Sequence, residues 1–565
     1  MPDLELPATA HRAGAPAAGP AAPDRGADEP ASGSGASDRG ADGPLSGSAA
    51  PDRGADEPLS GSVAGPARDE PTVDGRRRAT LAWRPVLAIM AVTGLVHLAV
   101  ATRFGWHRDE FYYVISGRHL AWGYPDQPPL APLLARLAAD LPDGVLPLRL
   151  LAIAAQLGCV LLVAALVAEL GGRGRAQAVA AGAVAACPVF VAASMLFGTT
   201  VLDQLAWAAV LLTVTRALRT GTVRGWLLAG AVAGIGLENK DTIGVLLLGI
   251  TIGVLLFHRA ALRTAGPWLG AALAVLLTVP NLLWDARHGW PELHMGAVLA
   301  AQQGGPLGSL AQLPELALLL AGPPLVTLWF FGIRWLASEP GRNHRWILVV
   351  AATAIVVFTA SGGKSYYPAP VLIGLFAAGS RWFEARSVAT APRQRWRYPV
   401  AIVTCGIFAV VFGLPVLPVR AENVLRAVNP QPVETYGWPS FVRQVTAAAA
   451  TMPPGTTIFT SNYGEAGALT TLGPADGLRL PVASGHNAYM LWGPPPGTTP
   501  DHVLCVGEFD PHYLHRAWSD VREIAPITTP GGIVDEETAQ HAAIYSCSRP
   551  HGNWTRLWPT LRHLD

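Results

Sequence analysis

HRDEFYYVISGRHLAWGYPDQPPL, residues 107–130, follows directly on the first long apolar run of the chain. It places two adjacent carboxylates, Asp109 and Glu110, before a group of aromatic residues and a proline-rich turn. Because a helix N-terminus stabilises negative charge, both carboxylates are expected to be ionised at neutral pH. Such a group can accept a proton from an attacking hydroxyl, bind a metal ion or cap a helix. The pair alone does not decide among these roles.

The same segment has one apolar face. Phe111, Val114, Ile115 and Trp122 have helical spacing, while charged residues crowd the N-terminal end. This pattern predicts a short helix lying along a membrane surface. The prolines that then turn the chain back before the next apolar run are Pro125, Pro128, Pro129 and Pro132.

The composition is that of a membrane protein. Half of the 565 residues are hydrophobic, 14% are charged and the formal net charge is +1, which excludes a typical soluble enzyme and a nucleic-acid binder. Arginine is the usual cation, since the 41 basic residues include only two lysines, Lys240 and Lys364. The positions of these two lysines are therefore informative.

Residues 1–80 differ from the rest of the chain. They are rich in Ala, Gly, Pro, Ser and Asp, and a 14-residue repeat begins at positions 24, 38 and 52 with the sequence DRGAD. Such a segment buries too little apolar surface to offset chain entropy, so it is predicted to be a disordered tail. It has no apolar core near its start and does not resemble a signal peptide.

Long apolar runs recur from Arg84 to about residue 418, and many are long enough to cross a bilayer. They predict a polytopic α-helical region, 81–419, with about eleven transmembrane helices. The runs cover 85–102, 145–170, 176–196, 201–218, 225–238, 242–258, 267–284, 313–335, 346–360, 367–382 and 399–418.

Arginines collect in every second loop between these runs, beginning before the first. Because cytoplasmic loops carry the excess of positive charge, the N-terminus is predicted to be inside. The loop 103–144 and everything after residue 418 are then outside. Both lysines also fall on the outer side, which makes them candidates for a function there.

Residues 420–565 predict a separate extracytoplasmic α/β domain. An amphipathic helical pattern covers 438–452, and strands are predicted at 456–462, 502–509 and 542–548. None of the five cysteines has CxxC or Cys/His ligand spacing, so a cysteine zinc site is not indicated. Cys505 and Cys547 lie outside the apolar runs, and a disulfide between them stays open.

Several motifs carry a family resemblance. The segment 107–130 resembles the first extracytoplasmic loop of the GT-C glycosyltransferases of family 39, which include protein mannosyltransferases, lipid A aminoarabinose transferases and RgtA/B/C/D-like enzymes. That loop reads R-D-E, an aromatic stretch, then D-x-P-P-L. GIGLENKDT, PNLLWDARHGWP and GGKSYYPAP resemble further family segments in the same order, so the likeness covers about 85–390. TSNYGEAGAL and SGHNAYMLWGPP look like the tail of a bacterial subgroup. His486, Asn487, Tyr489 and Trp492 of the second motif have the polar and aromatic character of carbohydrate contacts, a mixture that is also common in ordinary loops.

The resemblance implies an inverting glycosyltransferase in the cytoplasmic (inner) membrane. Such an enzyme takes a sugar from a polyprenyl-phosphate donor and gives it to an acceptor hydroxyl of a glycan, lipid or protein on the outer face. Asp109 matches the family's catalytic aspartate and is assigned as general base, with Glu110 as a supporting or acceptor-binding carboxylate. Lys364 and Tyr367 match residues near the donor phosphate, where a compact positive charge and a hydroxyl donor suit a phosphate oxygen.

Other residues are weaker candidates, and each has a purely structural alternative. Gln127 stands where relatives often have His or Lys, which puts a phosphate contact at that position in doubt. The additional candidates for the donor phosphate are Arg108, Lys240 and His288. Those for acceptor or sugar contacts are Tyr112, Tyr113, Gln127, His486 and Trp492.

Two other functions compete with a transferase. A transporter would show inverted repeats with broken helices and ionisable residues deep in its spans, and the sequence gives little sign of either. A non-catalytic envelope scaffold would make Asp109 dispensable. No cofactor is required by the motifs, and a divalent metal ion is left open. The donor sugar and the acceptor are not identified.

Overall fold

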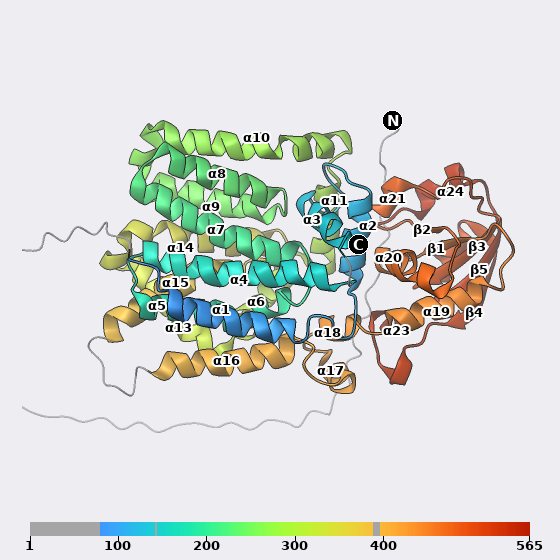
Figure 1. Cartoon of the computed structure of the whole chain (residues 1–565). Helices are drawn as coiled ribbons and strands as arrows, with labels where there is room; N and C mark the ends of the chain where they lie inside the picture. The colour runs from blue at the N-terminus through green and yellow to red at the C-terminus, as the bar shows by residue number, and fades with distance from the viewer. Residues whose placement is uncertain (1–78, 142–143, 388–395, 565) are drawn as a thin grey trace, which may run out of the picture. The chain divides into compact units, whose positions relative to one another are not determined.

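The computed structural model describes residues 79–141, 144–387 and 396–564. The predicted tail, 1–80, therefore lies outside the described residues except for its last two positions. A helical region extends from α1 (Trp83–Leu98) to α16 (Arg397–Gly413), and a mixed α/β region follows it (Figure 1). The boundaries at 81 and 419–420 remain predictions.

Helices coincide with all eleven predicted apolar runs. Among the described residues, three are long and apolar enough to cross a membrane: α4 (Leu146–Glu169), α7 (Thr199–Thr220) and α10 (Ala265–Arg287). The protein is a multi-pass membrane protein, and the number of eleven spans remains a prediction. Shorter apolar helices are α1, α3 (Leu130–Ala139), α8 (Val223–Leu237), α9 (Thr242–Phe257), α14 (Trp346–Ala360) and α16.

Two predicted runs are broken at prolines. The run 176–196 forms α5 (Gly174–Ala186) and α6 (Pro188–Ala193), with extended backbone at Cys187 between them. The run 313–335 forms η2 (Glu315–Leu320), η3 (Pro323–Leu325) and α13 (Val326–Ala337). Proline lacks the N–H that would continue the preceding helix, so each break begins a new element. These two breaks were not predicted from the sequence.

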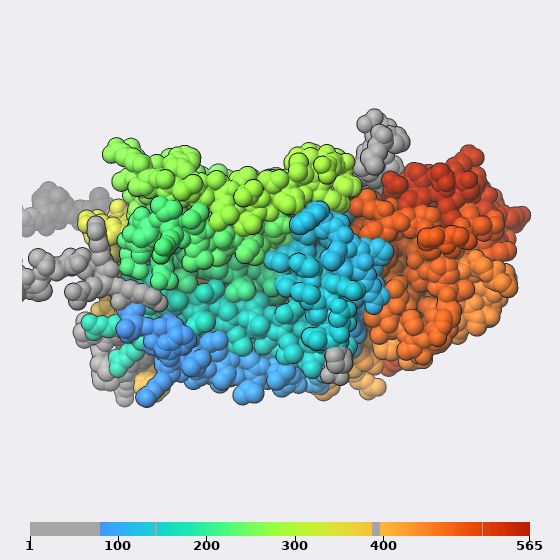
Figure 2. Space-filling view, turned by 45° about the horizontal axis from the view of Figure 1, so that its top comes forward, coloured from blue at the N-terminus to red at the C-terminus, as the bar shows by residue number. Residues whose placement is uncertain are grey.

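Exposed apolar side chains line several helices. On α10, the largest exposed fractions are 63% at Trp268 and 66% at Leu276, and Figure 2 shows this helix, in green, along one edge of the surface. Such exposure in a long apolar helix suits contact with lipid. The remaining elements of this region are η1 (Arg259–Arg263), α11 (Pro291–Gln302), α12 (Gly305–Ala311), η4 (Glu339–His344) and α15 (Val371–Ser387).

The predicted surface helix is α2 (Arg108–Arg118), and protein covers its apolar residues. Phe111, Val114 and Ile115 are buried, and Phe111 belongs to the hydrophobic core of the C-terminal region. Trp122 lies beyond the end of the helix and is 62% exposed, so it does not share that face. Protein therefore covers the apolar residues of α2, and its location along a membrane surface remains a prediction.

The C-terminal region contains a five-stranded mixed sheet in the order β2-β1-β3-β5-β4. β1 runs parallel to β2 and β3, whereas β5 is antiparallel to β3 and β4. The register pairs Phe459 with Ala483 and Cys505, and Cys505 with Tyr545. The strands are β1 (Thr457–Thr460), β2 (Val482–Ser484), β3 (His502–Gly507), β4 (Trp518–Pro526) and β5 (Ala543–Pro550).

Helices cover this sheet and fill its core. α19 (Trp438–Ala449) packs its apolar face with Phe111 of α2, which joins the two regions in one core. All five cysteines are free and buried, including Cys505 and Cys547 on the adjacent strands β3 and β5. The other elements are α17 (Val419–Leu425), α18 (Gln431–Glu434), α20 (Tyr463–Leu472), η6 (Gly473–Asp476), α21 (Tyr489–Trp492), α22 (Pro511–His515), η7 (Pro530–Gly532), α23 (Glu536–Ala539) and α24 (Trp554–Leu561).

Candidate active site

The N-terminus of α2 presents Asp109. His107 caps the helix through its ring nitrogen Nδ1, which accepts from the Asp109 backbone N–H at 3.2 Å. The Glu110 carboxylate accepts from the backbone N–H of His107 at 3.0 Å, completing a capping box. This local geometry explains why a helix begins at this point of the sequence.

Glu110 forms a buried ion pair that fixes α2 to the membrane region. Arg149 of α4 donates from Nε to Glu110 Oε1 at 2.5 Å and from Nη2 to Oε2 at 2.7 Å. The backbone N–H of Phe197 also donates to Oε1, at 3.1 Å. The Glu110 and Arg149 side chains are 0% and 1% exposed, respectively. With both oxygens occupied by protein donors, Glu110 supports the loop rather than offering a free oxygen to an acceptor.

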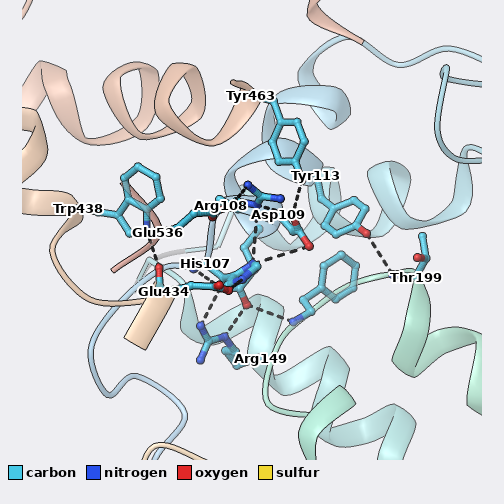
Figure 3. A network of polar contacts seen from close by, with 12 residues as sticks. His107, Arg108, Asp109, Tyr113, Arg149, Thr199, Glu434, Trp438, Tyr463 and Glu536 are labelled. Atoms are coloured by element: carbon cyan, nitrogen blue, oxygen red, sulfur yellow. Dashed lines mark hydrogen bonds and ion pairs between the residues drawn. The ribbon is translucent and has the colours of Figure 1, made fainter. Parts of the chain in front are cut away.

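Asp109 points the other way and is 41% exposed (Figure 3). Its Oδ1 accepts a hydrogen bond from the Tyr463 hydroxyl at 2.7 Å. Burial raises the pKa of Asp109, but His107, Arg108, the Tyr463 hydroxyl and Lys364 outweigh it, so the net pKa is lowered. The carboxylate is therefore ionised and reaches open space.

Arg108 is held by the C-terminal region. Its guanidinium donates to Glu536 of α23 and lies over the Tyr463 ring, 5.3 Å from the centroid. Its Nε is 3.8 Å from Asp109 Oδ1. The positive charge therefore lies beside the carboxylate and is already paired with Glu536.

The two lysines interact with each other, and one of them acts on this carboxylate. Lys364, between α14 and α15, interacts electrostatically with Asp109, and it also repels Lys240. Lys240 lies between α8 and α9, with its Nζ 3.4 Å from Thr200 Oγ1 and 5.0 Å from the Tyr367 ring centroid. Burial lowers the pKa of each lysine. The loops that the sequence placed on one side of the membrane thus meet in the folded chain.

A first cavity, with a volume of about 410 Å³, opens at Asp109 and extends between apolar helices. Thr200, Ser365 and Tyr366 provide polar groups in its lining. Its apolar part includes Val189, Leu196, Leu319, Leu320, Phe408 and Phe412.

A second, smaller cavity of about 150 Å³ also borders Asp109. It shares Asp109, Tyr113 and Thr199 with the first cavity. The rest of its lining comes from the first loop, α11 and the C-terminal region, namely Tyr112, Asp126, Gln127, Met295, Leu299, Tyr463 and Asn487. Asp109 therefore lies where an apolar cavity and a polar cavity meet.

The remaining predicted residues divide into two groups. Tyr112, Tyr113 and Gln127 line the second cavity, and Tyr367 adjoins Lys240. His288, His486 and Trp492 line neither cavity. His288 caps α10 and stacks on Trp284 at 4.0 Å, His486 accepts from the Tyr463 backbone N–H at 3.2 Å, and Trp492 stacks on His119 at 4.3 Å.

Sequence reasoning missed Tyr463, Tyr366 and Arg149. For Tyr463, a signal exists in the spacing of the glycines that follow it. A Cβ at Gly464 would come within 2.5 Å of Arg108 Cβ, and one at Gly467 within 2.5 Å of Phe111 Cβ. These glycines let α20 approach α2 closely enough for the Tyr463 hydroxyl to reach Asp109.

The described part of the chain holds no group of three or more His, Cys, Asp or Glu side chains placed to bind a metal ion. The cavities that border Asp109 carry the hydroxyl groups of Tyr113, Thr199 and Thr200, and His107, Arg108 and Lys364 act electrostatically on its carboxylate. This arrangement can remove a proton from a hydroxyl group and can balance a nearby negative charge.

Comparison with known proteins gives a family match and a shared fold. Residues 126–284 match the family described as dolichyl-phosphate-mannose-protein mannosyltransferase. No curated protein matches the chain. ArnT from Cupriavidus metallidurans bound to undecaprenyl phosphate has a TM-score of 0.52 and 14% identity, covering 82% of this chain and 97% of that chain. This likeness shows the fold.

Two further structures are similar at lower scores. ArnT from Cupriavidus metallidurans in the apo state gives a TM-score of 0.49 with 15% identity, covering 82% of this chain and 97% of that chain. Arabinofuranosyltransferase AftD from Mycobacteria gives 0.45 with 13% identity, covering 84% of this chain and 42% of that chain.

Proposed function

We propose that this chain, a GT-C glycosyltransferase of the lipid-linked-donor type, transfers the sugar to an acceptor hydroxyl with inversion and uses Asp109 as general base. One observation carries the proposal. An ionised, partly exposed Asp109 lies where an apolar and a polar cavity meet, and the charge of Lys364, which itself interacts with Lys240, acts on it.

The proposed reaction is a single displacement at the anomeric carbon. Asp109 takes the proton of the acceptor hydroxyl as its oxygen forms the new glycosidic bond, and the bond from the anomeric carbon to the phosphate oxygen breaks. The departing lipid phosphate keeps the bonding electron pair. Attack opposite the leaving group inverts the configuration.

Lys364 and Lys240 are the cations proposed to stabilise the leaving phosphate. Neither forms an ion pair with a carboxylate within 4 Å among the described residues, whereas Arg108 is bound to Glu536. A lysine ammonium is a compact charge suited to a phosphate oxygen. Tyr366, which lines the large cavity, is better placed than Tyr367 to donate a hydrogen bond there.

The apolar cavity supports a polyprenyl chain as the donor's lipid part. Its apolar lining residues, such as Leu196, Leu319 and Phe408, can make van der Waals contacts with an isoprenoid. The proposed orientation has the N-terminus inside and the C-terminal region outside the cytoplasmic membrane. Lys240, Lys364 and Asp109 would then face the outer side, where lipid-linked sugars rather than nucleotide sugars are available.

The test uses the full chain in lipid nanodiscs. Undecaprenyl phosphate carrying radiolabelled mannose, glucose or arabinose is supplied with cell-envelope acceptor fractions, and transferred label is measured. Asp109→Asn, which is nearly isosteric, is expected to lower transfer at least a hundredfold, since positioned general bases contribute roughly 10²–10⁴-fold. Asp140→Asn, on the same loop and exposed, is the matched control.

The variants also separate the roles of the groups. Lys364→Ala is expected to raise the KM for the donor more than the KM for the acceptor. Equal transfer by Asp109→Asn and wild type would refute the general base.

The two broken helices are the feature that favours a transporter. Flux of a labelled solute across vesicles that persists in Asp109→Asn would support that alternative.

A further inference from the structure

We propose that His486 and His563 are positioning residues for the glycosyl transfer, because they hold the Tyr463 ring so that its hydroxyl donates to Asp109. The inference rests on the proposed role of Asp109 as general base. In the described part of the chain, neither histidine lines a cavity that borders Asp109, so both act through Tyr463. The segment 561–563 thereby becomes part of the reaction centre.

Four rings form a continuous stack that leads to the Tyr463 hydroxyl. Tyr463 stacks on Tyr112 of α2 with the ring centroids 4.5 Å apart and on His486 at 4.8 Å, and His486 stacks on His563 at 4.9 Å. The interplanar angles of these pairs are 29°, 26° and 11°. Stacked rings attract each other beyond the burial of their area and restrict each other's orientation. The Tyr463 ring is therefore oriented in advance, with its hydroxyl 2.7 Å from Asp109 Oδ1 (Figure 3).

His486 also holds the backbone of Tyr463. Tyr463 is the first residue of α20, and the first N–H groups of a helix have no acceptor within the helix. The Nδ1 atom of His486 accepts from the Tyr463 N–H at 3.2 Å. This contact requires Nδ1 to be unprotonated, because only that form of the nitrogen has a lone pair for the bond. The same histidine thus fixes both the start of α20 and the ring that reaches Asp109.

His563 is held by its backbone and by its ring. Its N–H donates to the Gly485 carbonyl at 3.0 Å, and its carbonyl accepts from the Asn487 N–H at 3.2 Å. Its Nε2 donates to the Ser461 carbonyl at 2.9 Å. The residues on either side of His486 are therefore paired with the His563 backbone, and this pairing sets the two histidine rings opposite each other.

Close packing keeps the segment 561–563 in this place. The Tyr513 hydroxyl donates to the Leu561 carbonyl at 2.6 Å. Gly485 permits the approach, because a Cβ there would lie 1.8 Å from the Leu561 carbonyl oxygen. The glycine of the SGHNAYMLWG motif is thus explained by the backbone that crosses it.

A purely structural role of the histidines makes a different prediction from a positioning role. If they only stabilised the C-terminal region, the loss of the His563 ring would affect transfer equally with and without the Tyr463 hydroxyl. If they position that hydroxyl, the loss matters only while the hydroxyl is present. Residues that act through one shared contact are non-additive, whereas independent residues add.

A double-mutant cycle tests the inference with the full chain in nanodiscs and the donor sugar that the wild type transfers. His563→Gln removes the ring and keeps a donor for the Ser461 carbonyl, whereas His563→Phe keeps the ring and removes that donor. Each is made with and without Tyr463→Phe. His502→Ala, at an exposed histidine of β3, is the control. The readouts are kcat/KM across the pH range and the unfolding midpoint.

His563→Gln should lower kcat/KM on the acidic limb about threefold, within the range for one aromatic pair, and should move that limb to higher pH. In the Tyr463→Phe background it should have no effect, and His563→Phe should behave as the wild type.

Three results would overturn the inference: no effect of His563→Gln, an equal effect in both backgrounds, or a loss of transfer in folded His563→Phe. The last result decides even if His563→Gln lowers the unfolding midpoint. Failure of the general-base proposal would appear separately, as undiminished transfer by Asp109→Asn.

Discussion

Removing the Tyr463 hydroxyl should raise the pKa of Asp109. Tyr463→Phe keeps the ring beneath Arg108 and its stacking on Tyr112 at 4.5 Å, but it deletes the 2.7 Å hydrogen bond to Oδ1. The acidic limb of the pH profile of kcat/KM should move to higher pH, because the lost bond favoured the ionised form.

The size of the effect follows from the geometry. A hydrogen bond to a charged group contributes about 1.5–3 kcal/mol. Since 41% of the Asp109 side chain is exposed, water can replace part of this hydrogen bond in the variant. The net loss of stabilisation of the ionised carboxylate is then about 1 kcal/mol. This corresponds to a fall of roughly fivefold in kcat/KM on the acidic limb. At neutral and higher pH, where Asp109 is ionised in both proteins, activity should be nearly unchanged.

The assay is donor turnover measured across the pH range for wild type, Tyr463→Phe and Tyr545→Phe, a tyrosine of β5 away from both cavities. Unfolding midpoints check that the variants are folded. A uniform loss of activity at every pH would indicate a purely structural role for Tyr463. An unchanged acidic limb would show that the hydroxyl does not affect Asp109, and either result would refute the reasoning.

Two further predictions concern stability. Arg149→Met leaves Glu110 charged and buried, so thermal unfolding in detergent should show a loss of about 3–5 kcal/mol, and Arg149→Met combined with Glu110→Leu should restore part of it; equal stability of wild type and Arg149→Met would contradict this. Burial and the neighbouring Glu465 raise the pKa of Glu537. The contribution of protonated Glu537 to the free energy of unfolding is therefore fully present below pH 4.5, the ordinary pKa of a glutamate. It is lost as the pH rises from there through the raised pKa of the folded state. Glu537→Gln should raise the unfolding midpoint at pH 8 more than at pH 5, and an equal change at both would refute the sign.

In the C-terminal region, the elements that could be predicted from the sequence are those with a clear apolar periodicity. The helix at 438–452 and the strands around Phe459, Cys505 and Tyr545 have clear apolar periodicity, and the structure has α19, β1, β3 and β5 there. β2 was missed because three residues carry too little pattern. β4 was missed because it is an edge strand whose residues are mostly exposed and several are charged.

The candidate site was predictable only in part. Asp109 and Lys364 were found through motifs, and the structure brings them together. Tyr463 lies 354 residues from Asp109 along the chain, and only tertiary packing of α20 on α2 makes them neighbours. Likewise, the sequence could not tell that Glu110 would be paired with Arg149, because that choice depends on how α4 packs against the loop.

The shared core of α2 and α19 has a consequence for biosynthesis. Phe111 is made early, yet its partners Trp438 and Phe441 leave the ribosome more than three hundred residues later. Until then the first loop keeps an uncovered aromatic side chain. A nonsense codon between α16 and α20 would thus yield a protein that has its apolar helices but in which Phe111 lacks these partners and Asp109 lacks the Tyr463 hydroxyl.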